Sequence, residues 1–79
     1  MKLPRDLSGA DLISALKRLG YKQTRQTGSH VRMALSVPRQ AHLTVPLTRA
    51  IPAGTLAALI KDAATHLETT VDDVLRGIR

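Results

Sequence analysis

Apolar residues near the N-terminus of the chain recur at helical spacing. They fall on one face of a helix: Leu12, Ile13, Leu16 and Leu19. Ser8 stands where its side chain can cap the first backbone amides, and Asp11 suits the positive end of the helix dipole. Gly20 follows at the position where helices often end in a left-handed residue. The pattern therefore predicts a helix between Ser8 and Gly20.

The period of the pattern changes to two after Gly20, which is typical of strands. Three strands are expected, at residues 21–26, 30–37 and 42–45. Turns are expected between them, at residues 27–29 and 38–40. In the first turn Gly28 can adopt a positive φ, and Ser29 helps to shape and orient the turn. Pro46 ends the third strand or marks an edge.

Apolar and polar residues alternate along the second expected strand. Its core face carries Val31, Met33, Leu35 and Val37. His30 and Arg32 fall on the opposite face, together with His42 and Thr44 of the third strand and Arg25 of the first. One face of the sheet is therefore expected to be polar and open to a ligand.

Two more helices are expected toward the C-terminus. Pro52 fits the first position of the second helix, whose apolar residues again have helical spacing: Leu56, Leu59, Ile60 and Ala63. Thr70 can cap a short third helix with Asp72 and Asp73 in its first turn. This order predicts a single α+β domain over residues 1–79. We expect two layers, with a three-stranded antiparallel sheet, two helices on one face, and a short C-terminal helix.

Composition narrows the classes of function. The 79 residues include 12 basic and 6 acidic ones, a formal charge of +6. There is no cysteine, which excludes a disulfide framework, a thiolate zinc site, an iron–sulfur site and a cysteine nucleophile. Tyr21 is the only aromatic residue, which argues against modules that stack bases on aromatic rings. A secreted domain of this size would usually need disulfides, so we expect a cytoplasmic protein. No apolar run suits a transmembrane helix or a signal peptide, so we expect no membrane association.

The residues that could act in catalysis are few. The chain has one glutamate, five aspartates and three histidines: His30, His42 and His66. No carboxylate lies in the expected strands beside His30 and His42, so we expect no metal site. Ser29 and His30 are neighbours in the chain and would point to opposite faces of a strand, which argues against a nucleophile pair. His66 is expected at the surface or at a helix end.

RNA cleavage is one chemistry that these residues could support. RNA carries its own nucleophile, the 2′-hydroxyl, so the protein must supply an acid–base group and cations beside the phosphate. Histidine can serve as acid or base near neutral pH, and arginine stabilises developing phosphate charge. His30, Arg25, Arg32 and Arg49 could supply these groups without metal or cofactor. The same residues also fit a solvated surface pair, which is the commoner situation for a histidine beside an arginine.

Four short motifs occur in order along nearly the whole chain. They are Leu16 with Gly20-Tyr21, then Gly28-Ser29-His30, then Thr44-Val45-Pro46, then Pro52-Ala53-Gly54-Thr55-Leu56. Together, in a short basic chain, they make the sequence resemble the HicA toxins, which are YcfA-like mRNA interferases. Two positions depart from the family pattern. Val31 follows His30 where many members carry a second histidine, and Leu47 and Thr48 stand where a histidine or basic residue is common.

The resemblance has implications for fold, activity and partner. It implies a fold like that of a double-stranded-RNA-binding domain and ribosome-independent cleavage of mRNA, which stops translation. It also implies that the histidine of the Gly-Ser-His string, here His30, is the catalytic residue. The implied partner is a HicB-type antitoxin that covers the active face in a hetero-oligomer.

Our leading hypothesis is a metal-independent mRNA endoribonuclease toxin, without cofactor, in which His30 acts as the general acid or base. The expected RNA-binding residues are Lys22, Arg25, Arg32 and Arg49. Gly28 and Ser29 shape the turn before His30, while Gly54 and Thr55 serve the helix start and close packing, or their amides hold a phosphate. Two alternatives stay open: a non-catalytic RNA-binding module of the same fold, and an interaction protein that docks an acidic partner. His42 could share the groove of His30.

Overall fold

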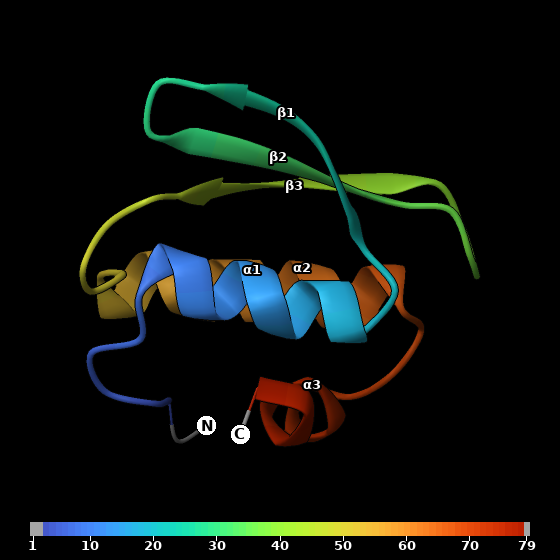
Figure 1. Cartoon of the computed structure of the whole chain (residues 1–79). Coiled ribbons are helices and arrows are strands. Elements are labelled where there is room, and N and C mark those ends of the chain that lie inside the picture. Colours follow the sequence, from blue (N-terminus) through green and yellow to red (C-terminus); the bar gives the residue numbers. More distant parts are fainter. Residues whose placement is uncertain (1–2, 79) are drawn as a thin grey trace.

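The structure is a computed structural model that describes residues 3–78. In chain order it contains α1 (Gly9–Arg18), β1 (Lys22–Thr27), β2 (His30–Leu35), β3 (Ala41–Pro46), α2 (Ala53–His66) and α3 (Val71–Ile78). Figure 1 shows the sheet as one layer, α1 and α2 beneath it, and α3 beneath those two helices. The predicted α+β class and element order are confirmed, and α3 adds a layer of its own.

The predicted ends of α1 are confirmed. The Ser8 side chain accepts a hydrogen bond of 3.0 Å from the backbone N–H of Asp11. Gly20 has a φ of 112°, a conformation that side chains with a Cβ rarely adopt. The chain therefore leaves α1 sharply and enters β1 almost at once.

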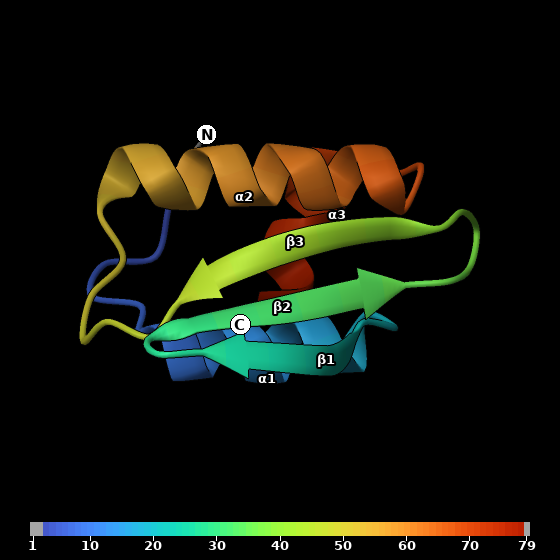
Figure 2. The same cartoon turned by 90° about the horizontal axis from the view of Figure 1, so that it is seen from above.

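The three strands form an antiparallel meander in the order β1-β2-β3. Figure 2 shows β2 between its two neighbours, with α1 and α2 running across the same side of the sheet. Residues alternate along β2 and β3 between buried and more exposed positions, and Val31, Met33, Leu43 and Val45 point into the core. Every residue of β1 is exposed.

Several predicted boundaries were wrong by one or two residues. β3 is longer than expected by one residue at each end, Ala41 and Pro46, and β1 extends to Thr27. β2 ends at Leu35, which pairs with Ala41, so Val37 lies beyond the ladder in the turn and is 78% exposed instead of buried. β1 begins after Tyr21, which is buried just before the strand. Pro52 is the N-cap of α2, with ψ of 143°, and not its first helical residue, because its backbone is still extended.

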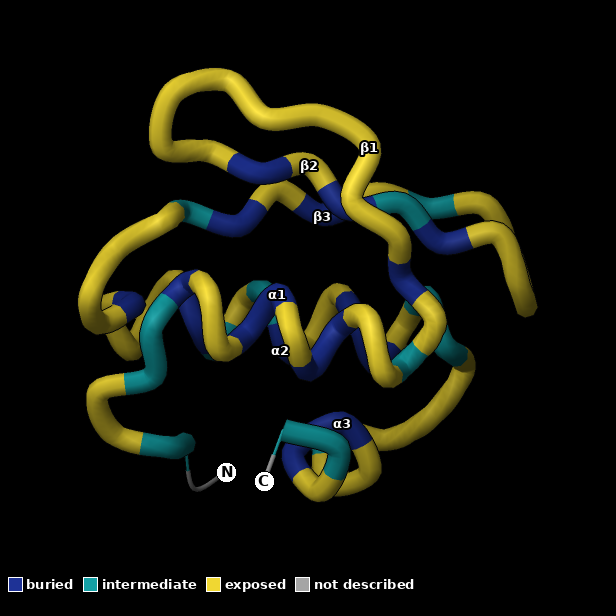
Figure 3. Tube along the Cα trace, in the orientation of Figure 1, coloured by how far each residue is buried: buried dark blue, intermediate teal, exposed yellow. Residues whose placement is uncertain are grey.

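The core lies between the sheet and the two long helices. Its most buried side chains include Leu12, Leu16, Met33, Val45, Leu56 and Ile60. α3 packs against α1 and α2 and buries Val74 and Leu75 there. Figure 3 shows that the buried positions of the strands and helices face one another, while most of the connections are exposed. Tyr21 and Ile51 are buried exceptions in the connections. None of the described helices is long and apolar enough to cross a membrane.

Candidate functional site

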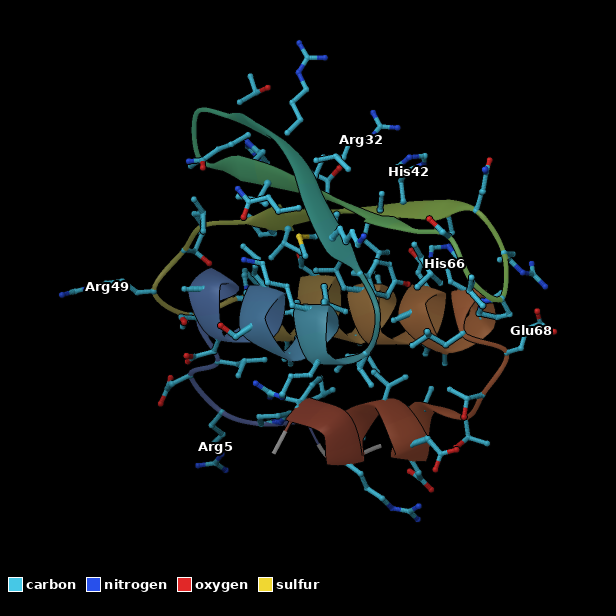
Figure 4. The ribbon with its side chains drawn as sticks, turned by 45° about the vertical axis from the view of Figure 1, so that its right-hand side comes forward. Arg5, Arg32, His42, Arg49, His66 and Glu68 are labelled. Carbon is cyan, nitrogen blue, oxygen red and sulfur yellow. The ribbon has the colours of Figure 1, made fainter. Side chains whose placement is uncertain are left out.

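The polar side chains predicted for one face of the sheet lie on the side turned away from α1 and α2, which we call the outer face. The strand register arranges it in three cross-strand rows. The proximal row is Thr27, His30 and Pro46; the middle row is Arg25, Arg32 and Thr44; the distal row is Lys22, Ala34 and His42. Figure 4 shows Arg32 and His42 rising from this face.

His30 occupies one end of the outer face, at the start of β2. The turn before it contains Gly28, whose φ of 57° confirms the predicted left-handed conformation. On one side His30 lines a shallow hollow of about 240 Å³ with Arg25, Thr27, Arg32 and Thr44. On the other side it lines a second hollow with Thr44, Pro46, Thr48, Pro52 and Thr55. The imidazole is exposed and can be approached from both hollows.

Arg25 and Arg32 stand directly opposite each other on β1 and β2. Like charges in this arrangement destabilise a sheet pair. Neither arginine takes part in the ion pairs found among the described residues, which join Arg39 to Glu68 and Arg76 to Asp73. An anion bound in the hollow would relieve the repulsion between the two guanidinium groups.

The distribution of charged residues along the chain also favours an anion at the outer face. Residues 21–52, which contain the three strands and their connections, include five basic residues and no acidic one. All six acidic residues of the chain lie in or next to the helices: Asp6, Asp11, Asp62, Glu68, Asp72 and Asp73. Three of the five, Lys22, Arg25 and Arg32, lie on the outer face, which therefore carries positive charge and no acidic residue.

Backbone contacts hold the rim of the two hollows. The N–H of Leu47 donates to the carbonyl of Ser29 at 2.6 Å, and the N–H of Gly9 donates to the carbonyl of Thr48 at 3.0 Å. A Cβ at Gly9 would collide with the carbonyl oxygen of Pro46, so only glycine allows α1 to approach this closely. The Ser29 carbonyl joins the turn to the connection after β3.

The other predicted site residues are more scattered. Arg49 is exposed in the connection between β3 and α2, and Figure 4 shows it pointing away from the sheet; it lines neither hollow beside His30. Lys22 belongs to the distal row and lines a separate hollow with Thr24, Ala34 and Ser36. His42 shares the outer face with His30 but pairs with Ala34, four residues along β2, so the two histidines do not share a hollow.

Several features of the site were missed in the sequence. Thr27 is the last residue of β1 and not part of the turn. It lines the same hollow as His30. A bulge between Gln23 and Arg25 places Lys22 and Arg25 on the same face, although three positions separate them. A Cβ at Gly54 would meet nothing within 4 Å, so close packing does not explain this glycine.

His66 lies at the predicted helix end, but its partner was not foreseen. Its Nδ1 is 2.9 Å from the hydroxyl of the buried Tyr21, between the sheet and α2. Burial, and to a lesser degree the charge of Asp62, raises the pKa of Tyr21 to about 12. This pair is a structural link and lies away from the outer face. Among residues 3–78, no group of three or more potential ligand side chains could hold a metal ion.

Comparison with known protein families gives a match that covers most of the chain. The family described as the HicA toxin of bacterial toxin–antitoxin matches residues 9–64, from the first residue of α1 into the last turn of α2. A search of curated proteins and a search of solved structures each find no match. The matched segment contains the whole sheet and both hollows beside His30. The chain belongs to the HicA toxin family, whose members pair with an antitoxin in toxin–antitoxin systems.

Proposed function

We propose that this chain is an mRNA endoribonuclease, the toxin of a type II system, and that His30 is its catalytic residue. The observation that carries the proposal is that His30, Arg25 and Arg32 line one hollow on a face without acidic residues. HicA family membership supports an mRNA interferase activity, since that is the general activity of the family. An mRNA substrate places the activity in the cytoplasm.

The reaction follows from the chemistry of RNA. The 2′-hydroxyl loses its proton and its oxygen attacks the adjacent phosphorus, the bond from phosphorus to the 5′ oxygen breaks, and that oxygen takes up a proton. The products are a 2′,3′-cyclic phosphate and a 5′-hydroxyl. His30 is the only histidine lining either hollow among the described residues, so it carries out one of the two proton transfers and water the other.

Arg25 and Arg32 bind the phosphate that reacts. Two guanidinium groups facing each other can hold phosphate oxygens from both sides and stabilise the charge that develops on them. Gly28 and Ser29 position the start of β2, and therefore His30. Lys22 and Arg49 contact parts of the RNA outside this hollow, because they lie in the distal row and in the connection before α2. No metal or cofactor is required for these steps.

The partner in our proposal is a HicB-type antitoxin that forms a hetero-oligomer with the toxin. An acidic surface on the antitoxin would suit the five basic residues of residues 21–52. An antitoxin bound there would also cover His30 and exclude RNA. Binding of antitoxin and binding of RNA are therefore expected to compete.

The test is cleavage of an end-labelled mRNA by the antitoxin-free protein in EDTA, resolved on a denaturing gel. We expect wild-type protein to cleave, and His30→Ala to lose at least about 100-fold in rate, as is typical when a general acid or base is removed. His66→Asn is the matched control, because the asparagine amide offers both a donor and an acceptor near the position of Nδ1 and can keep a hydrogen bond with the Tyr21 hydroxyl. This control should cleave at nearly the wild-type rate.

Each other outcome contradicts a defined part of the proposal. Undiminished cleavage by folded His30→Ala would remove His30 from the mechanism. RNA binding without any cleavage by the wild-type protein would favour the non-catalytic binding module. Cleavage that EDTA abolishes would contradict the metal-independent reaction.

A further inference from the structure

The distal row of the outer face is a second cationic site that the proposed reaction does not use. Its members Lys22 and His42 are exposed and stand on either side of Ala34, on the two edge strands. Ala34 is four residues from His30 along β2, which corresponds to about 13 Å. The distal row therefore lies one row beyond the Arg25–Arg32 pair, on the side away from His30.

The backbone of β1 is built so that Lys22 reaches this face. Lys22 and Arg25 are three positions apart, and in a regular strand their side chains would point to opposite faces. The bulge between Gln23 and Arg25 adds one residue, Thr24, whose hydroxyl donates to the carbonyl of Arg32 at 3.3 Å. Both cations consequently lie on the outer face, as expected for a bulge that redirects a side chain.

The Lys22 side of the distal row has room for a ligand, in a hollow that His42 borders from across Ala34 without lining it. Lys22, Thr24, Ala34 and Ser36 line a hollow of about 400 Å³ together with Gly20 and Val37. Ala34 has a small side chain, so the centre of the row is not filled. The Lys22 ammonium group and the Thr24 and Ser36 hydroxyl groups around it suit phosphate and ribose oxygens. Tyr21, the only aromatic residue, is 2% exposed, so the sheet cannot hold bases by stacking on aromatic rings.

We propose that Lys22, Ala34 and His42 form a second subsite, which binds a phosphate of the same RNA strand beyond the scissile bond. The strand would then run along β2, from His30 past the Arg25–Arg32 pair to the distal row. This inference rests on the proposed ribonuclease function and adds a direction and a minimum length for its substrate. A dinucleotide has a single phosphate and cannot bridge the distance between His30 and the distal row.

The experiment measures kcat/KM for a series of single-stranded RNAs with one cleavable bond. The series starts at a dinucleotide and is lengthened one nucleotide at a time, on the 5′ side or on the 3′ side. We expect a gain of about tenfold at one defined length and on one side only, since a charge-assisted phosphate contact has this magnitude. In Lys22→Ala and His42→Ala the ratio of long-substrate to dinucleotide kcat/KM should fall by most of that gain.

Salt dependence provides a second readout on the long RNA. The slope of log affinity against log salt should fall in magnitude by about 0.7 in Lys22→Ala, which corresponds to one phosphate on a single strand. Lys61→Ala removes an exposed lysine of α2 and should change neither the length dependence nor the slope by a comparable amount.

The outcomes separate this inference from the function on which it rests. No cleavage of any RNA by folded protein would overturn the proposed function itself. Cleavage with no gain on lengthening, or with a gain on one side that Lys22→Ala and His42→Ala leave intact, would overturn the second subsite alone. Equal losses in Lys61→Ala would show a general charge effect and would also overturn it.

Discussion

Arg25 and Arg32 show how single residues of this site work against the stability of the sheet. They face each other across β1 and β2, and no acidic residue lies in the strands to offset their repulsion. A sheet selected only for stability would place an acidic or neutral residue at one of the two positions. The repulsion therefore supports a role for the pair in holding an anion.

We expect Arg25→Gln to raise the free energy of unfolding by about 0.2–1 kcal/mol at low salt, because it removes the repulsion. The gain should disappear at high salt, where exposed charges are screened. Urea unfolding at two salt concentrations measures both effects, and the same variant should bind RNA more weakly. Arg76→Gln serves as control, because it removes an arginine that is paired with Asp73 and should not stabilise the protein. A less stable Arg25→Gln would contradict this account.

Residue alternation was enough to predict the face of His30 and Arg32, because β2 is regular and one of its faces is buried. It was not enough for β1, where all six residues are exposed and no apolar residue indicates which side chains face the core. The bulge that brings Lys22 and Arg25 to one face has no signal in the residues KQTRQT. Arg49 could not be placed either, since the connection before α2 has no periodic pattern that fixes a direction.

At the scale of elements, the junction of α1 with the end of β3 determines the rim of the site. Gly9 lies against the carbonyl of Pro46 and donates to the carbonyl of Thr48. The predicted caps of α1 and α3 were confirmed. The side chains of Ser8 and Thr70 each accept from a backbone N–H three residues later, and such a local contact can be predicted from the sequence. The contact of Gly9 is between distant segments, so the sequence offered no sign of it.

Gly9→Ala is expected to lower the free energy of unfolding by about 1–3 kcal/mol, since the added Cβ must displace backbone. Gly54→Ala tests the opposite case, because a Cβ there meets nothing within 4 Å and alanine favours the helix by up to about 1 kcal/mol. Denaturant unfolding of both variants gives the two values. A neutral Gly9→Ala, or a Gly54→Ala that is clearly less stable, would show that the packing differs from the structure.

For the molecule as a whole, the Tyr21–His66 hydrogen bond joins the beginning of the sheet to the end of α2. Helical spacing placed His66 at the end of its helix, but the pairing with Tyr21 spans 45 positions of the chain and depends on how the layers stack. The buried hydroxyl also makes stability depend on pH. Folding favours the protonated tyrosine, since burial raises its pKa from 10.0 to about 12.

We therefore expect the contribution of Tyr21 to be complete below about pH 10 and to be lost as the pH rises toward 12. The difference of about 2 in pKa corresponds to at most about 3 kcal/mol. Tyr21→Phe should be less stable than wild type at pH 7 by about 1 kcal/mol and should lack this part of the alkaline decline. Unfolding of both proteins between pH 9 and pH 12 makes the comparison, and parallel curves would contradict the raised pKa.

The separation of charge between the strands and the helices gives the molecule an electric dipole. The charged residues within 21–52 are all basic, five in number, whereas the rest of the chain holds six acidic and seven basic residues and is nearly neutral. A polyanion that approaches from any direction exerts a torque on this dipole and turns the sheet toward itself before contact. Such steering raises the rate of association and is weakened by salt, because the Debye length shrinks. The orientation needed for productive encounter is thus imposed at long range, and RNA and an acidic partner chain would both gain from it in speed.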